Sequence, residues 1–137
     1  MVAMRSAKRR KKLIEEMKEL LSEISELVDV VVVEGPRDVE SLRRLGYAGE
    51  IVTCAATGVN DYDLMTEVST RHSSVLILTD FDQEGTMLNK RFDEILEHEG
   101  VKVERGLRRM VGRLTASLGI YAIESVDNLM DAAERDI

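Results

Sequence analysis

Four consecutive valines, at positions 30 to 33, constrain the fold more than any other feature of this chain. An unbroken β-branched run of this length is typical of a strand that is buried on both faces, as strands of parallel sheets are. The run stops at Glu34 and Gly35, and Pro36 can occupy the first position of a following helix. A second apolar run covers residues 74–79 and also ends in an acid, Asp80. Two such strands indicate an α/β protein built on a parallel sheet.

Short apolar runs alternate with helical patterns along the whole sequence. Strand-like runs lie at residues 30–33, 51–53, 74–79 and 101–103, and helical patterns lie at 6–28, 36–45, 60–71, 85–99, 107–118 and 125–134. Strands that alternate with helices of this length form βαβ units with right-handed crossovers. We therefore predict a Rossmann-like α/β fold, with a central, mostly parallel, four-stranded sheet, helices on both faces and an N-terminal amphipathic helix.

The first helical pattern combines an apolar stripe with a basic start. Its apolar residues recur at helical spacing over residues 13–28. We expect residues 1–28 to form a helix packed on a single domain of residues 29–137, which closes with a helical extension. The same stripe is suited to packing on a second subunit, so a homo-oligomer through this helix is a further expectation.

Composition narrows the setting in which the chain works. One domain is expected from 137 residues, and no run of about 18 apolar residues is present to span a membrane. The single cysteine, Cys54, excludes an internal disulfide, and no apolar signal-peptide core follows the basic start. Both observations favour a cytoplasmic protein. Two histidines and one cysteine are too few for a usual zinc site.

The net charge of −7 conceals an asymmetry along the chain. Residues 1–12 hold six basic residues and no acid, whereas the rest of the chain holds 13 basic and 26 acidic residues. An acidic body does not bind polyanions through its net charge. Any binding of nucleic acid must therefore use local basic groups and metal ions.

Three carboxylates follow the two most apolar strands. Glu34 comes directly after the valines, and Asp80 and Asp82 come after the strand at 74–79. Because parallel strands end at one edge of a sheet, neighbouring strands would bring these acids within about 5 Å of lateral spacing. An unpaired cluster would repel itself and raise its own pKa values, and Mg²⁺ suits such oxygen ligands and supports phosphodiester chemistry. For any single acid, the alternative is a helix cap or a solvated loop.

Two motifs at these strand ends resemble those of the Toprim family, the catalytic module of topoisomerases, bacterial-type primases, some nucleases and the small ribosomal-RNA maturase nuclease. The first motif, a strand followed by Glu-Gly and then by Asp three residues after the Gly, matches the segment from Val31 to Asp38. The second, a strand followed by Asp-x-Asp and then by Gly, matches the segment from Leu76 to Gly85. The resemblance spans roughly residues 29–105, and the chain most resembles the stand-alone small Toprim proteins.

The resemblance implies a Toprim fold and gives roles to the acids. Glu34 would act as the catalytic general acid/base or as a metal ligand, and Asp80 and Asp82 would hold one or two Mg²⁺ ions, with Mn²⁺ able to substitute. Many family members have Lys directly after Glu-Gly, whereas this chain has Pro36 and then Arg37. Further residues expected to support the site are Gly35, Arg37, Asp38, Glu84 and Gly85.

Two basic groups are candidates for contact with nucleic acid, with RNA favoured over DNA. The N-terminal group opposes the helix dipole, which favours a partner, but a solvated helix start is the alternative. The second group follows the last strand, and its alternative is ion pairing with the acidic body. No aromatic platform accompanies either group, which argues against base stacking as the main contact. The groups are Lys8, Arg9, Arg10, Lys11 and Lys12, and Arg105, Arg108, Arg109 and Arg113.

Three functions are compatible with these patterns. The leading hypothesis is a Mg²⁺-dependent phosphoryl-transfer enzyme of the nuclease type, in which Glu34 moves the proton. A second is a non-catalytic Toprim module that binds RNA or a ribonucleoprotein. A third is a phosphatase of the haloacid-dehalogenase type, whose nucleophile motif is also Asp-x-Asp after an apolar strand. Glu84 stands where that family has Thr or Val.

Overall fold

A computed structural model describes residues 2–55 and 58–135, with side chains from Ser6 onward. Within these residues the chain forms one sheet of four parallel strands in the order β2-β1-β3-β4. Val31 of β1 lies opposite Ile51 of β2 on one side and opposite Leu76 of β3 on the other. The predicted parallel α/β architecture is therefore confirmed. The strands are β1 (Val30–Val33), β2 (Glu50–Thr53), β3 (Ser74–Ile77) and β4 (Lys102–Val103).

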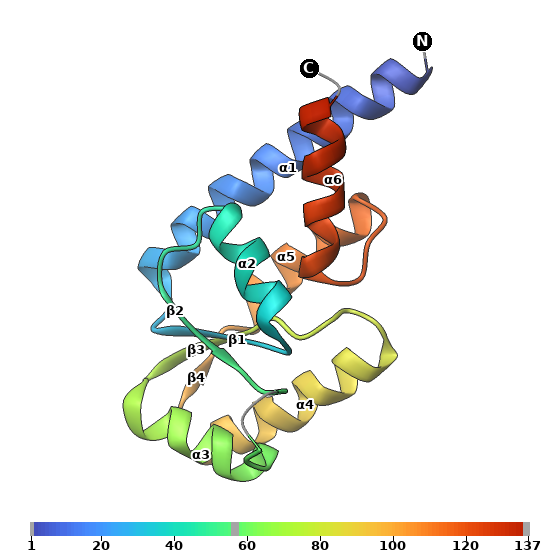
Figure 1. Cartoon of the computed structure of the whole chain (residues 1–137). Coiled ribbons are helices and arrows are strands. Elements are labelled where there is room, and N and C mark those ends of the chain that lie inside the picture. The colour runs from blue at the N-terminus through green and yellow to red at the C-terminus, as the bar shows by residue number, and fades with distance from the viewer. Residues whose placement is uncertain (1, 56–57, 136–137) are drawn as a thin grey trace.

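Helices cover both faces of the sheet, as Figure 1 shows. Above the sheet in that view lie α1 (Val2–Leu27), α2 (Pro36–Arg44), α5 (Arg105–Ser117) and α6 (Val126–Arg135), with the short 3₁₀ helix η1 (Ile123–Ser125) before α6. Below it lie α3 (Asp61–Arg71) and α4 (Gln83–His98).

The valines of β1 divide between two cores, one on each face. Val31 and Val33 pack under α1, α2, α5 and α6, whereas Val30 and Val32 pack against α3 and α4. Successive side chains of a strand point to opposite faces, so a strand covered on both sides needs apolar residues at every position. All four valines are fully buried, which is the physical reason for the unbroken run.

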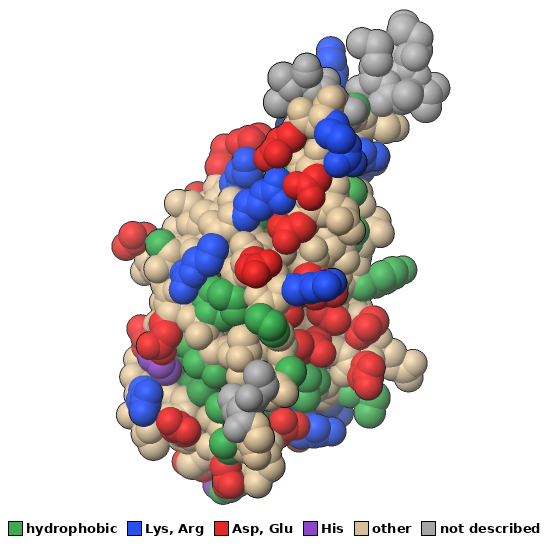
Figure 2. Space-filling view, viewed as in Figure 1, with side chains coloured by type: hydrophobic (Ala, Val, Ile, Leu, Met, Phe, Trp, Pro, Cys, Tyr) green, Lys and Arg blue, Asp and Glu red, His purple; other side chains and the backbone are tan. Residues whose placement is uncertain are grey.

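The apolar stripe of α1 packs within its own chain. Ile14, Met17, Leu21 and Ile24 are buried in the upper core. Beyond them the basic first turns of α1 project past the body of the molecule (Figure 1), and blue side chains gather over this end in Figure 2. The helix begins at Val2, earlier than predicted, because Ala, Met, Arg and Lys all favour helix. No helix of the described residues is long and apolar enough to cross a membrane.

The start of α4 differs from its predicted position at Gly85. Asp82 caps this helix, because its Oδ1 accepts a hydrogen bond from the backbone N–H of Gly85 at 2.7 Å. The helix therefore begins at Gln83, and the third carboxylate of the predicted cluster serves as its cap. Asn60 caps α3 in the same way, because its Oδ1 accepts a hydrogen bond from the backbone N–H of Asp63 at 2.9 Å.

The strand order places a topological switch point between β1 and β3. From β1 the chain moves to β2 on one side and then returns to β3 on the other side. At such a switch point the connecting segments diverge, and open parallel sheets bind ligands beyond the carboxyl ends of the two strands. Glu34 and Asp80 follow those two ends, so the fold brings them to this switch point.

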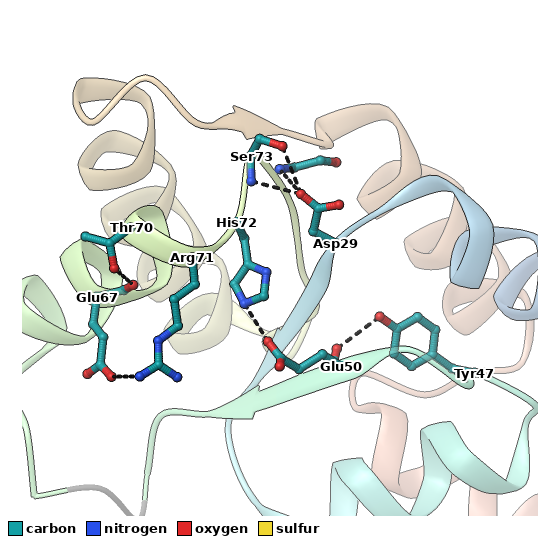
Figure 3. Close-up of polar contacts among 9 residues, drawn as sticks. Asp29, Tyr47, Glu50, Glu67, Thr70, Arg71, His72 and Ser73 are labelled. Carbon is teal, nitrogen blue, oxygen red and sulfur yellow. Dashed lines mark hydrogen bonds and ion pairs between the residues drawn. The ribbon is translucent and has the colours of Figure 1, made fainter.

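Polar contacts join the segments at the opposite, amino end of the sheet (Figure 3). Asp29 accepts hydrogen bonds from the backbone N–H and hydroxyl of Ser73, which lower the pKa of its carboxyl. His72 Nε2 lies 2.5 Å from Glu50 Oε2, and the Tyr47 hydroxyl donates to the Glu50 carbonyl at 3.0 Å. The acids of this end therefore stabilise loops, in contrast to those at the carboxyl end.

Candidate functional site

Glu34 and Asp80 meet at the carboxyl edge of the sheet. Glu34 Oε2 accepts a hydrogen bond of 2.7 Å from the backbone N–H of Asp80. This contact spans the gap between β1 and β3 and fixes the Glu34 carboxylate beside the start of the Asp-x-Asp segment. Two of the three predicted acids are therefore brought together by the pairing of their strands.

Burial together with neighbouring carboxylates raises the pKa of Asp80 to about 7. Burial is the largest cause, followed by the negative charge of Glu34 and then that of Asp38. Desolvation and like charge both penalise the ionised carboxylate. The site therefore favours anything that adds positive charge beside Asp80, whether a proton or a cation.

Replacing Asp80 by Asn should stabilise the chain at alkaline pH when no divalent cation is present. Because the pKa of Asp80 is raised to about 7 in the folded chain, the protonated carboxyl favours the folded state. This stabilisation is complete below about pH 4 and is lost as pH rises through 7. Asn carries no charge to repel Glu34. After allowance for solvent screening of this partly exposed group, the gain over wild type should grow by about 1 kcal/mol between about pH 5 and pH 9.

Urea unfolding in EDTA at both pH values measures this gain. Glu40→Gln is the matched control, because Glu40 is exposed on α2 and its change should give the same small difference at both pH values. A gain from Asp80→Asn that does not depend on pH would contradict the proposed repulsion.

Gly85 lets the backbone of Asp80 lie against the first turn of α4. A Cβ on Gly85 would stand 2.1 Å from the Asp80 carbonyl oxygen, far inside van der Waals contact. The buried Thr79 hydroxyl donates to the Gly85 carbonyl at 2.8 Å and joins the two segments further. Gly85 thus permits the close approach of two backbone segments. Around Gly35 a Cβ would meet no atom within 4 Å.

Arg108 binds the end of β3 from within the fold. Its Nη1 donates to the carbonyls of Ile77 and Thr79 at 3.1 and 2.9 Å, and its Nη2 donates to the Asp80 carbonyl at 3.1 Å. The guanidinium also lies over the Phe81 ring, 4.4 Å from its centroid. Burial lowers the pKa of Arg108 to about 10, although the charges of Glu34 and Asp80 act in the opposite direction.

The residues expected to support the site differ in their burial and contacts. Asp38 is buried, and its carboxylate accepts from the N–H of Gly35 at 3.2 Å and from that of Glu124 at 3.3 Å. Burial raises the pKa of Asp38, and these two hydrogen bonds oppose the rise. Asp38 therefore ties the start of α2 to η1 in the C-terminal extension. Arg37 and Glu84 are exposed in the first turns of α2 and α4.

The two predicted basic groups differ in their contacts. Arg105 forms a two-pronged ion pair with Asp93, at 2.6 and 2.7 Å, which joins α5 to α4. Arg109 and Arg113 are exposed and form no ion pair with residues that the structure describes. Within that part of the chain, no ion pair is formed either by the N-terminal group Lys8, Arg9, Arg10, Lys11 and Lys12.

Two aromatic residues that the sequence did not single out lie beside Arg109 and Arg113. Phe81 and Tyr121 line one hollow with these arginines, so aromatic side chains do accompany this basic group. For Phe81 the signal was available: alternation within Asp-x-Asp sends its side chain away from the flanking aspartates. No local signal marks Tyr121, which lies 40 residues further along the chain.

The oxygen donors of the site suit Mg²⁺. Among the described residues no group of three His, Cys, Asp or Glu is arranged to hold a metal ion. Mg²⁺ commonly takes one or two carboxylates and completes its shell with water. The pair formed by Glu34 and Asp80 meets that requirement, and the raised pKa of Asp80 reflects the negative charge a cation would offset.

Comparison with known proteins identifies the family. A family model described as the Toprim domain matches residues 29–106, which is more than half of the chain. This chain belongs to the Toprim family. The matched segment runs from the residue before β1 to the start of α5, and both Toprim strand-end motifs lie inside it. The helices α1 and α6 and most of α5 lie outside the Toprim match.

Relatives of similar length share most of this Toprim chain. A UPF0292 protein of Methanocaldococcus jannaschii is 41% identical over 116 residues, which cover 84% of this chain and 87% of the relative. A UPF0292 protein of Pyrococcus abyssi is 34% identical over 110 residues, 80% of each chain. The solved structure of a protein from Aquifex aeolicus matches with a TM-score of 0.60 and 22% identity, over 84% of this chain and 95% of that one, and supports the fold.

Proposed function

We propose that this Toprim protein is a Mg²⁺-dependent nuclease that acts on nucleic acid, with RNA as the favoured substrate. The observation that carries the proposal is the contact between Glu34 and Asp80 at the switch point of the sheet. The two carboxylates lie at the strand ends beyond which open parallel sheets bind ligands. Because burial and then the negative charge of Glu34 raise the pKa of Asp80, the site would gain from a divalent cation.

In this proposal each residue of the site has a separate task. Glu34 and Asp80 would hold Mg²⁺, with Mn²⁺ able to substitute, and Asp82 would add a ligand through the oxygen that does not cap α4. A bound ion would neutralise the phosphate and lower the pKa of water. Glu34 would move the proton of the attacking water, because the Asp80 N–H fixes the position of its carboxylate. Arg108 would keep the Asp80 backbone in place.

Local basic groups supply the attraction that the acidic body lacks. The N-terminal group extends on the projecting first turns of α1 (Figure 1), and Arg109 and Arg113 are exposed on α5. Unpaired arginine and lysine side chains bind phosphates and release counterions, which makes such binding sensitive to salt. The proposed RNA substrate therefore has two positively charged approaches to a chain of net negative charge.

Glu34→Gln should reduce metal-dependent cleavage by at least about 100-fold, because Gln keeps the shape of Glu but cannot take a proton. The assay follows labelled structured and single-stranded RNAs and DNAs with Mg²⁺, Mn²⁺ or EDTA. Glu40→Gln is the matched control, since Glu40 is an exposed acid of α2 outside the site. Equal cleavage by wild type and Glu34→Gln, or cleavage in EDTA, would overturn the catalytic role.

A non-catalytic module that binds RNA or a ribonucleoprotein is the second candidate. One observation favours it: Asp82 is engaged as the cap of α4, and the described residues include no group of three His, Cys, Asp or Glu arranged to hold a metal ion. This candidate is supported if wild type binds RNA tightly in EDTA and cleaves none of the nucleic acids with either metal. The two candidates are thus separated by measuring binding and cleavage on the same RNAs.

A further inference from the structure

A groove beside α5 lies next to the acidic site and includes the two exposed arginines of that helix. It is lined by Phe81, Arg109, Gly112, Arg113, Ile120 and Tyr121, and we call it the α5 groove. Its volume of about 490 Å³ falls in the usual range of small-molecule sites. A second hollow of about 320 Å³ shares Phe81, Arg109 and Gly112 with it.

Tyr121 presents the accessible aromatic ring of the α5 groove. Its side chain is 68% exposed, whereas its backbone carbonyl accepts a hydrogen bond of 2.6 Å from the N–H of Phe81. The Phe81 ring is covered by the Arg108 guanidinium, and a Cβ on Gly112 would stand 2.9 Å from its Cε1. Phe81 is therefore a packed wall of the groove, and Tyr121 is the ring that a ligand can reach.

Two cations stand beside that ring. Arg109 and Arg113 are exposed, lie one helical turn apart on α5, and have no ion pair in the described part of the chain. Arg105 and Arg108, by contrast, are engaged with Asp93 and with the end of β3. An accessible aromatic face next to two available guanidinium groups complements a planar base that carries phosphates.

We propose that the α5 groove binds an unpaired nucleotide, with its base stacked on Tyr121 and its phosphates facing Arg109 and Arg113. The proposal deepens the function proposed above and rests on it, because the nucleotide belongs to the same nucleic acid that approaches Glu34 and Asp80. Phe81 stands between Asp80 and Asp82 in the chain, so one loop carries the acids and a wall of the α5 groove. A base in a duplex is already stacked, so the groove favours single-stranded segments.

Binding of a short single-stranded RNA with a central 2-aminopurine, measured in EDTA with the full chain, tests the base contact. Stacking on Tyr121 should quench the fluorescence of the base. Tyr121→Leu should weaken binding by about 10-fold and abolish the quenching, whereas Tyr121→Phe keeps the ring and should stay within about twofold of wild type. The matched control is Tyr62→Leu, because Tyr62 is 57% exposed on α3, across the sheet from the α5 groove.

An RNA with an abasic site at the central position separates stacking from general loss of binding. Wild type should lose about 10-fold on this RNA, and Tyr121→Leu should lose no more than about twofold, because its base contact is already gone. The double variant Arg109→Gln, Arg113→Gln should reduce the slope of log K against log salt concentration. The reduction should be about 1 to 2 in magnitude, the value expected for the loss of two phosphate contacts. Arg71→Gln, at an exposed arginine paired with Glu67, should leave the slope unchanged.

The outcomes separate this inference from the nuclease proposal. Equal binding by Tyr121→Leu and wild type, equal losses for Tyr121→Leu and Tyr62→Leu, or no measurable binding of the RNA by wild type would each overturn the nucleotide site. Quenching that requires Tyr121 while the same RNA is never cleaved would support the α5 groove and remove the nuclease. Thermal unfolding of every variant within a few degrees of wild type shows that a loss of binding is local.

Discussion

Gly85→Ala should lower the free energy of unfolding by about 3 kcal/mol, a large effect for one methyl group. The new Cβ would stand 2.1 Å from the Asp80 carbonyl oxygen, and both partners are backbone, which no rotamer change can relieve. Either the first turn of α4 or the Asp80 backbone must move. Because Thr79, Asp80 and Asp82 all bond across this junction or flank it, the displacement should reach the acids as well.

Urea unfolding followed by far-UV circular dichroism measures the loss, and Gly106→Ala provides the control. Gly106 lies in the first turn of α5, where a Cβ meets only the flexible Arg109 side chain at 3.7 Å. Ala favours helix over Gly, so this change should be neutral or should stabilise by up to about 1 kcal/mol. Two alanine variants of equal stability would contradict the close approach at Gly85.

Arg108→Met should destabilise the chain by about 3 kcal/mol. The methionine keeps the apolar contact with Phe81 but removes the donors to the carbonyls of Ile77, Thr79 and Asp80. Partly buried carbonyls that lose their partners retain the cost of desolvation. The change also removes the positive charge that faces Glu34 and Asp80, so repulsion between these carboxylates grows.

Arg109→Met is the matched control for this prediction, because Arg109 is the exposed neighbour on α5 and should change stability by no more than about 0.5 kcal/mol. Arg108→Lys should fall between the two, since a single ammonium keeps the charge but cannot span carbonyls that a planar guanidinium reaches with two nitrogens. A loss for Arg108→Met no greater than that for Arg109→Met would show that the carbonyl contacts carry no net stability.

Both predictions bear on the rigidity of the site. The Asp80 backbone is held from three directions: by Glu34, by close contact with Gly85 and by Arg108. Preorganised carboxylates bind a cation without further rearrangement, which is what a metal site on a rigid scaffold requires. Holding Asp80 there buries its carboxyl beside Glu34 and Asp38, which raises its pKa.

Local sequence patterns were enough to predict much of the secondary structure and the position of the acids. Burial on both faces requires apolar residues at every strand position, so the four valines of β1 and the run in β3 were recognisable from the sequence. Turn chemistry marked Pro36 as the first residue of a helix. The acids were recognisable because they directly follow the two apolar strands.

Tertiary structure alone decided which distant groups meet. The adjacency of β1 and β3, which unites Glu34 with Asp80, depends on strand order and not on any local pattern. The sequence did not determine whether Asp82 caps a helix, and the position of α4 shows that it does. Arg108 shares a sequence cluster with Arg109, yet the position of α5 against β3 turns the first inward and leaves the second exposed. Sequence periodicity reports how each segment faces its surroundings, whereas contacts between segments are fixed only when the whole chain packs.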